Sequence, residues 1–359
     1  MFTRFQTTAS ILVAAAVLAA APLARTADQG YFANALVSDQ PGVAPHTDAK
    51  LIDPRGILAR PDGRVIIANG GSDASTAYHP DGAPYALIID VPPGAAASGP
   101  AIPTGLGYNT SSGFVISNGI ASAPAHVMLV TKSGTIAGFN AQVDPKSAIT
   151  AVDNSAKDAV YTGCAMGGND NGLFLYAANF KSGFVEMYGP GFKLVKSFTD
   201  AKIPKDYGPF GIRNINRRLY VTYAKRLAPD YTGAEPGVGQ GYVDVFDLNG
   251  KLTKRLVARG NLNAPWGLAM AGDDFGSYSG DLLVANHGNG HINAYDPTTG
   301  QLDGILSMPS GESLTIEGLF GIALAKVNIV PNQEDDILYY TADPNDHHDG
   351  VLGIVTVAP

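Results

Sequence analysis

Residues 263–306, NAPWGLAMAGDDFGSYSGDLLVANHGNGHINAYDPTTGQLDGIL, decide the fold of this chain. They predict four short β-strands: the apolar runs Gly267–Ala271 and Asp281–Asn286, the alternating run His291–Tyr295, and a closing run at Gln301–Leu306. Gly, Pro, Asn and Asp separate these runs, because such residues supply the fixed or positive φ angles that tight turns need. The stretch therefore reads as one four-stranded unit.

The unit recurs along the chain. Motif glycines fall at positions 56, 105, 163, 211, 267 and 321, roughly fifty residues apart, which is within the period expected of propeller blades. Several of the motifs read Pro-x-Gly, as in Pro54-Arg55-Gly56 and Pro265-Trp266-Gly267. An apolar second strand that ends on a small or polar residue follows in each clear copy, for example at 66–71 (IIANGG) and 282–287 (LLVANH). Six such units predict an all-β fold, a six-bladed β-propeller with four-stranded blades.

The two ends of the chain predict how the ring closes. The last blade offers only three strands, Gly321–Lys326, Ile337–Ala342 and Gly350–Val357, whereas Tyr31–Ser38 is a strand without a blade of its own. Pairing this N-terminal strand onto the last blade would leave no open sheet edge, which propellers must avoid. We expect that closure.

The first 27 residues predict an export signal. Arg4 precedes the apolar run Ile11–Ala21, which has the length of a signal-peptide core and is too short to span a bilayer as a helix. An uncleaved anchor is the alternative. No later stretch is long and apolar enough for a membrane span, so we expect a secreted or periplasmic protein, with residues 28–359 forming a single propeller domain.

Composition narrows the possible partners. The 359 residues include 43 Gly and 24 Pro but only 16% charged residues, and the net charge is −8. An acidic chain without a basic cluster is a poor candidate for binding nucleic acid. The single cysteine, Cys164, excludes an internal disulfide and falls in a predicted inner strand, which favours a buried, inert thiol. We expect a monomer. No HExxH, GxSxG, P-loop or CxxC motif supports an enzyme of those classes.

Several segments together resemble a known family. The order LVSDQPGVAPHTDAKLIDPRGI, AVYTGCAM, PFGIRNINRRLYVTYAK, LLVANHGNGHINAYDPTTG and ILYYTADPNDHHDG is similar to that of exported bacterial β-propeller proteins without an established reaction, and the likeness covers residues 34–358. Arg55 departs from that family's usual Trp, and the chain ends without the sorting tail that some members have. More distantly, the blades look like those of NHL-repeat proteins and of gluconolactonase-like calcium enzymes. Likeness of fold does not transfer function.

The topology predicts where a site would lie. Inner strands begin, and second strands end, on the same face of a propeller, here termed the top face, around the mouth of the central channel. We expect a ligand-binding surface there; its residues are Arg55, Phe210, Tyr223, Trp266 and Phe320. Four oxygen-bearing side chains at the ends of second strands would suit Ca²⁺, as the likeness to the calcium enzymes also implies; they are Asn69, Asn179, Asn286 and Asp343. The alternative is that these side chains only cap the turns of their own blades.

Histidines supply the remaining candidates. His287, with His291 on the same top loop, is the best acid–base candidate near the channel. The polar segment 343–350 (DPNDHHDG) offers His and Asp ligands for a transition metal, although a solvated loop is favoured because adjacent histidines on a strand point apart. The long segment 228–240 is either a cover for the mouth or a flexible insertion.

Three functions of different classes remain open. The favoured hypothesis is a binding or scaffolding module that presents its top face to a protein, a glycan or a small molecule. The second is a calcium-dependent hydrolase or lactonase with the ion at the channel mouth and His287 beside it. The third is a structural protein of the cell envelope.

Overall fold

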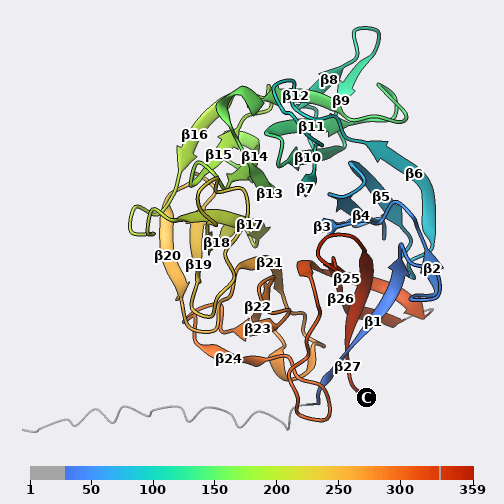
Figure 1. Cartoon of the computed structure of the whole chain (residues 1–359), viewed down its shortest axis with the longest axis vertical. Helices are drawn as coiled ribbons and strands as arrows, with labels where there is room; N and C mark the ends of the chain where they lie inside the picture. The colour runs from blue at the N-terminus through green and yellow to red at the C-terminus, as the bar shows by residue number, and fades with distance from the viewer. Residues whose placement is uncertain (1–28, 331–332) are drawn as a thin grey trace, which may run out of the picture.

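Six β-sheets stand as blades around a central axis (Figure 1). The computed structural model describes residues 29–330 and 333–359, with the backbone alone for 326–330 and 333–336. The expected export signal lies outside these ranges. Among the described residues, no helix is long and apolar enough to cross a membrane. The arrangement confirms the six-bladed propeller that the glycine spacing predicts.

Each blade has four antiparallel strands. The innermost strands, in blade order, are β3 (Pro54–Ala59), β7 (Pro103–Tyr108), β13 (Tyr161–Asn169), β17 (Tyr207–Ile215), β21 (Pro265–Met270) and β25 (Leu319–Val330). The second strands are β4 (Val65–Asn69), β10 (Val127–Thr131), β14 (Gly172–Asn179), β18 (Arg218–Lys225), β22 (Leu282–Asn286) and β26 (Gln333–Ala342). The inner strands contact one another in sequence around the ring, and β25 contacts β3.

The outer half of each blade follows the same order. The third strands are β5 (Ala74–Tyr78), β11 (Thr135–Phe139), β15 (Phe184–Tyr188), β19 (Gly241–Asp247), β23 (Ile292–Tyr295) and β27 (Val351–Val357). The outermost strands are β6 (Pro84–Asp90), β12 (Ile149–Asp153), β16 (Leu194–Phe198), β20 (Leu252–Ala258), β24 (Leu302–Ile305) and β1 (Tyr31–Ser38). Five short elements lie outside this pattern: β2 (His46–Thr47), β8 (Val115–Ser117) and β9 (Ser122–Pro124), which form a hairpin, and the 3₁₀ turns η1 (Ser155–Lys157) and η2 (Gly276–Tyr278).

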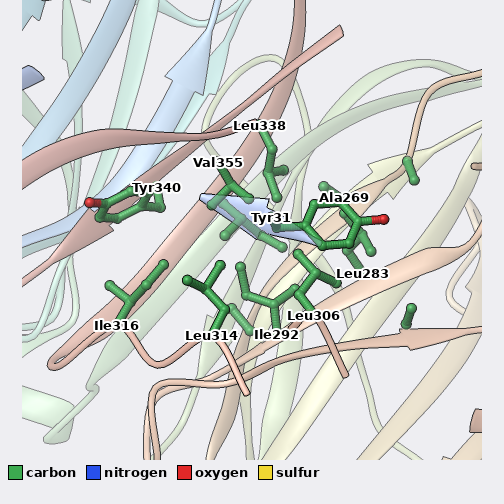
Figure 2. Packing of buried hydrophobic residues seen from close by; sticks show 14 of the residues in the cluster. Tyr31, Ala269, Leu283, Ile292, Leu306, Leu314, Ile316, Leu338, Tyr340 and Val355 are labelled. Atoms are coloured by element: carbon green, nitrogen blue, oxygen red, sulfur yellow. The ribbon is translucent and has the colours of Figure 1, made fainter. Parts of the chain in front are cut away.

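The N-terminal strand closes the ring, as predicted. β1 pairs antiparallel with β27 from Tyr31↔Val357 to Ser38↔Val351, and β2 pairs in parallel with β1 beyond it. Tyr31 is fully buried between the fifth and sixth blades, next to Leu283, Leu338 and Val355 (Figure 2). Its hydroxyl donates a hydrogen bond to the Phe275 carbonyl at 2.9 Å. The first described strand is therefore part of the core.

The motif glycines have a steric role that explains their period. A Cβ on Gly211 would lie 2.0 Å from the Trp266 carbonyl oxygen, and one on Gly321 would lie 2.5 Å from the Arg55 carbonyl oxygen. In both cases the obstacle is the backbone of the next inner strand. Since the six inner strands converge on one axis, a residue without a side chain is required where neighbouring backbones come closest.

Candidate functional site

Aromatic side chains close the channel at the top face. The residues before the motif glycines surround the mouth; in blade order they are Arg55, Thr104, Thr162, Phe210, Trp266 and Phe320. Trp266 donates its indole N–H to the Thr162 carbonyl of the third blade at 3.1 Å, and its ring lies edge-on to Phe320 with centroids 6.0 Å apart. Phe210 is buried in the same apolar cluster. We term Phe210, Trp266 and Phe320 the plug.

The channel below the plug is almost filled. A cavity of about 30 Å³ remains among the inner strands, and Arg213 and Cys164 line it. Arg213, on the fourth blade, donates to the Ile57 carbonyl of the first blade at 3.3 Å, so its side chain crosses the axis. Burial raises the pKa of the Cys164 thiol, which agrees with the inert cysteine expected from the sequence. This space among the inner strands holds little more than a water molecule.

His287 lies directly on the plug. Its ring stacks on Phe320 with centroids 3.9 Å apart, and its Nδ1 lies 3.1 Å from the Leu319 carbonyl oxygen. A carbonyl can only accept, so Nδ1 carries the proton and Nε2 is left as an acceptor. Burial, together with the charge of Arg55, lowers the pKa of His287 to about 4. His287 is thus a neutral imidazole at physiological pH.

Four charged side chains meet beside the plug where the first and last blades join. We term Asp53, Arg55, Asp343 and His347 the seam cluster. Arg55 donates its Nε to both Asp53 carboxylate oxygens at 2.9 Å, and its Nη2 lies 2.8 Å from Asp53 Oδ2. The His347 Nδ1 lies 3.2 Å from Asp53 Oδ1 and also contacts Asp343 Oδ2. Residues of two blades are thereby joined at the seam.

The two carboxylates of the seam cluster are buried, with residue exposures of 4% for Asp53 and 3% for Asp343. Burial disfavours the Asp53 carboxylate, but the Arg55 charge and the His347 hydrogen bond outweigh it and lower its pKa. Asp343 has no arginine partner, and burial raises its pKa. Hydrogen bonding to Asp343 and Asp53 raises the pKa of His347 to about 9. The seam cluster therefore consists of two adjacent ion pairs, Asp53 with Arg55 and Asp343 with His347.

Strand register explains why Asp343 differs from the asparagines that the sequence groups with it. Asn69 pairs with Pro54 and Asn286 with Pro265, whereas the equivalent Leu319 pairs with Ala342. Asp343 therefore lies one residue beyond the asparagine position, in the loop rather than on the strand. This shift places its carboxylate against the loop and the neighbouring blade instead of within its own blade.

The three asparagines are engaged in their own blades. The Asn179 Oδ1 accepts the Val160 N–H at 3.3 Å, and the Asn286 Oδ1 accepts the Asn263 N–H at 3.1 Å. Asn69 donates its amide to Thr76 Oγ1 at 2.9 Å. The structure brings Asp343 together with Asp53 and His347, not with these amides. For Asn179 and Asn286 the observed contacts are those of the alternative interpretation, in which these side chains cap the turns of their own blades.

The remaining predicted residues divide between mouth and core. Arg55, Phe210, Trp266 and Phe320 all lie at the mouth, where Arg55 sits 4.8 Å above the Phe320 ring. Tyr223 is fully buried in the core between the third and fourth blades, so it does not face the mouth.

Sequence reasoning missed Asp53, and it favoured a solvated loop for the segment 343–350, whereas His347 of that segment contacts Asp53 and Asp343. His347 reaches the cluster because Asn345, Asp346 and His347 are three consecutive residues with left-handed φ angles of 62°, 51° and 68°. This turn brings the loop after β26 back beside the start of β3 (Figure 1). A charged residue directly before the Pro-Arg-Gly motif was the available signal for Asp53.

A hollow of about 220 Å³, which we term the mouth hollow, lies above the plug. Its walls come from the fifth and sixth blades, and it includes His287, Glu317, Asp343 and His347. Ala234 and Pro236 of the long loop after β18 complete it. Several contacts hold that loop, among them the hydrogen bond from the Gly237 N–H to Asn263 Oδ1 at 2.6 Å and the ion pair of Lys225 with Glu235 at 2.7 Å. The segment 228–240 thus covers part of the mouth, which was one of its two expected roles.

A second hollow, the lysine hollow, lies across the mouth between the second and third blades. It has a volume of about 360 Å³, and Lys132, Ser133, Ser155 and Thr232 are among its lining residues. Burial, together with the charge of Arg55, lowers the pKa of Lys132 to about 8. Lys132 has no ion-pair partner within the part of the chain that the structure describes.

The chain has relatives among known viral proteins. No protein-family model matches it. The uncharacterized protein R648 of Acanthamoeba polyphaga mimivirus is 33% identical over 331 residues, which span 90% of this chain and 79% of the viral protein. The uncharacterized protein L690 of the same virus is 31% identical over 332 residues, spanning 89% of this chain and 84% of that protein.

The chain belongs to this family of mimivirus proteins. The expectation of an exported bacterial family was wrong, because the relatives found are viral. Part of that resemblance came from second strands such as LLVANH, which has a counterpart, IIANGG, within the propeller itself.

Solved structures support the fold. A streptogramin B lyase structure has a TM-score of 0.55 at 10% identity and covers 92% of this chain and 99% of its own. Virginiamycin B lyase from Staphylococcus aureus has a TM-score of 0.52 at 12% identity, with 91% and 99% covered. At these identities the likeness concerns the propeller fold alone.

Proposed function

We propose that the protein is a binding module that takes a small polar ligand into the mouth hollow. The observation that carries this proposal is the convergence of His287, Asp343 and His347 on the mouth hollow. The His287 ring rests on Phe320 of the plug, and Ala234, Pro236 and Ala264 supply apolar surface. Small-molecule sites are concave and orient their ligand with a few precisely placed polar groups.

The dimensions and polar groups define the class of ligand. A volume of about 220 Å³ lies below the roughly 300–1,000 Å³ of sites for drug-sized molecules, so the ligand is small. His287 Nε2 offers an acceptor, His347 a donor, and Asp343 an acceptor. Such walls suit a hydroxylated compound, for example a monosaccharide, a polyol or a hydroxy acid.

Calcium-dependent hydrolysis is the alternative enzymatic function. His287 favours an acid–base role, because a neutral imidazole with Nε2 free can accept a proton from a bound hydroxyl or water. However, the amide oxygens of Asn179 and Asn286 already accept backbone hydrogen bonds, which leaves the expected calcium set short of ligands. Binding without catalysis therefore accounts for more of the geometry.

A ligand screen tests the proposal. We would follow the melting temperature of the protein with millimolar monosaccharides, polyols and hydroxy acids, and then titrate each compound that raises it. Trp266 is the single tryptophan and part of the plug, so its fluorescence reports binding there. We expect saturable binding with a change in that fluorescence.

Two substitutions, one at His287 and one at Lys132, sharpen this test. His287→Asn keeps a donor near the Nδ1 position, for the Leu319 carbonyl, but removes the Nε2 acceptor. It should weaken ligand binding about tenfold or more, as expected for a hydrogen bond lost in a buried site. Lys132→Met alters the opposite hollow and is the matched control, which should bind as the wild type does. Equal affinity of all three proteins for every compound, or no compound that binds, would overturn the proposal.

A further inference from the structure

We propose that Asp53, Asp343 and His347 form a binding site for a divalent transition-metal ion at the seam between the first and last blades. The inference adds a metal to the proposed function, on which it rests only in placing the ion at the edge of the mouth hollow. Asp343 and His347 line that hollow, so an ion between them would be open to a small ligand from one side.

The ligand atoms are already gathered. One carboxylate oxygen from each aspartate and one ring nitrogen of His347 all lie within 4.8 Å of one another. Metal–oxygen and metal–nitrogen bonds of about 2.0–2.2 Å require ligand atoms to lie roughly 3–4.4 Å apart. Coordination therefore requires small side-chain adjustments, in which the His347 ring moves away from Asp343 to admit the ion.

The environment of Asp343 is the strongest evidence for a bound cation. Only 3% of the Asp343 surface is exposed, and its Oδ1 has no hydrogen-bond partner among the residues that the structure describes. Its Oδ2 meets only the His347 ring. A buried carboxylate without partners is costly, and its usual remedies are an ion pair, a hydrogen bond or a metal. Arg55 acts on Asp343 only through its charge, because its Nε and Nη2 are directed at Asp53 and it makes no hydrogen bond to Asp343 among the described residues.

The donor set selects the class of metal. Two carboxylate oxygens and one imidazole nitrogen suit Zn²⁺, Mn²⁺, Fe²⁺ or Co²⁺, whereas Ca²⁺ takes six to eight oxygens. A divalent cation would replace the proton that His347 carries, and with two carboxylates and Arg55 the occupied cluster would bear one net positive charge. Arg55 stays beside Asp53 to orient it, as outer partners of metal ligands do. With three protein ligands, at least one coordination position is left for water or for a ligand from the mouth hollow.

Calorimetry on the full chain tests the site, with Zn²⁺, Co²⁺ and Ca²⁺ each titrated into chelator-treated protein. We expect one Zn²⁺ or Co²⁺ per chain, visible absorption from bound Co²⁺, and much weaker binding of Ca²⁺. His347→Ala and Asp343→Asn should each weaken Zn²⁺ binding at least 30-fold. His348→Ala is the matched control, because the neighbouring His348 ring makes no hydrogen bond or ion pair with described residues, and its affinity should stay within twofold of the wild type.

Each other result contradicts the site. If the wild type binds no stoichiometric metal, the cluster is only a pair of ion pairs, and His347→Ala should then change the melting temperature alone. If His347→Ala and His348→Ala weaken binding equally, the metal sits on exposed histidines. Ca²⁺ binding that survives His347→Ala would indicate an oxygen-only site. Should a substitution reduce folding, as judged by the Trp266 fluorescence melt, His347→Gln replaces His347→Ala.

The metal and the mouth ligand can fail independently. A compound from the screen that still binds after chelation supports the mouth hollow while the metal site falls. Stoichiometric Zn²⁺ lost in His347→Ala, with no compound bound, supports the metal site while the ligand proposal falls.

Discussion

Replacing Gly211 by Ala perturbs the closest approach between two inner strands. The added Cβ would lie 2.0 Å from the Trp266 carbonyl oxygen and 2.9 Å from Thr222 Oγ1. Thr222 Oγ1 accepts the Gly211 N–H at 2.8 Å and lies 3.3 Å from the Trp266 oxygen, so one hydroxyl links both strands. A methyl group at this position clashes with a backbone atom, so the two inner strands must move apart to admit it.

The expected cost follows from this obstacle. Overpacking a well-packed core costs about 1–3 kcal/mol, and more where backbone must shift. We therefore expect Gly211→Ala to lose about 3 kcal/mol of unfolding free energy. Gly163 is the matched control, because the atom nearest its added Cβ is the Phe210 carbonyl oxygen at 3.5 Å, an ordinary contact. Neither glycine has a positive φ angle, so Gly163→Ala should stay within about 1 kcal/mol of the wild type.

Urea unfolding followed by the fluorescence of Trp266 is the assay, since the sole tryptophan adjoins the perturbed position. Gly211→Ala should lower the midpoint and also shift the native emission, because the Trp266 carbonyl must move. Gly163→Ala should do neither. Equal midpoints for the two variants would refute the view that these glycines recur because inner strands touch at them.

Two further predictions concern buried charges away from the seam. At pH 8 Lys132, with a pKa near 8, is about half neutral, whereas an exposed lysine is less than about 1% neutral. Reductive methylation with formaldehyde should therefore modify Lys132 before surface lysines, as measured by peptide mass spectrometry. Equal labelling of all lysines would contradict the burial of Lys132. Burial also raises the pKa of Asp244 to about 7, above its unfolded value of about 3.9, despite the Arg255 Nε 3.3 Å away. The native state then binds the extra proton between about pH 4 and 7, so stability should fall as pH rises through that window, by at most about 4 kcal/mol; Asp244→Asn should flatten this fall in urea midpoints, and an unchanged slope would assign the pH dependence to other groups.

The fold could be predicted from the sequence because its signals are local. Five of the six motif glycines, all but Gly163, answer the same steric demand, since an added Cβ would lie 2.6 Å or less from the backbone of the next inner strand. Tyr31–Ser38 could be assigned to the last blade because that blade lacked one strand. Such features need no knowledge of distant contacts. They are read from the spacing of small residues and from the count of strands.

The site was only partly predictable, because it depends on register and on loops. Arg55, Trp266 and Phe320 could be placed at the mouth since they precede motif glycines. Asp343 could be singled out, but its one-residue offset from the asparagine position is a matter of strand pairing that periodicity does not reveal. His347 depends on a run of left-handed residues, none of them glycine, which sequence patterns disfavour.

The position of the seam cluster follows from the way the ring is closed. The loop after β26 is tied to the start of the first blade by a backbone hydrogen bond, in which the Asp53 N–H donates to the Asp349 carbonyl at 3.2 Å. The same loop is tied to the end of β1, because the Gly350 N–H donates to Asp39 Oδ1 at 2.8 Å. Asp53 and Asp343 are therefore close only in a closed ring. An ion held between them would bind the folded state and not the open chain, so binding and closure are linked: at a metal concentration 100 times the dissociation constant, the folded ring would gain about 2.7 kcal/mol. This linkage gives the buried charges at the seam a structural consequence as well as a chemical one, because the residues that would hold the ion are the residues that ring closure brings together.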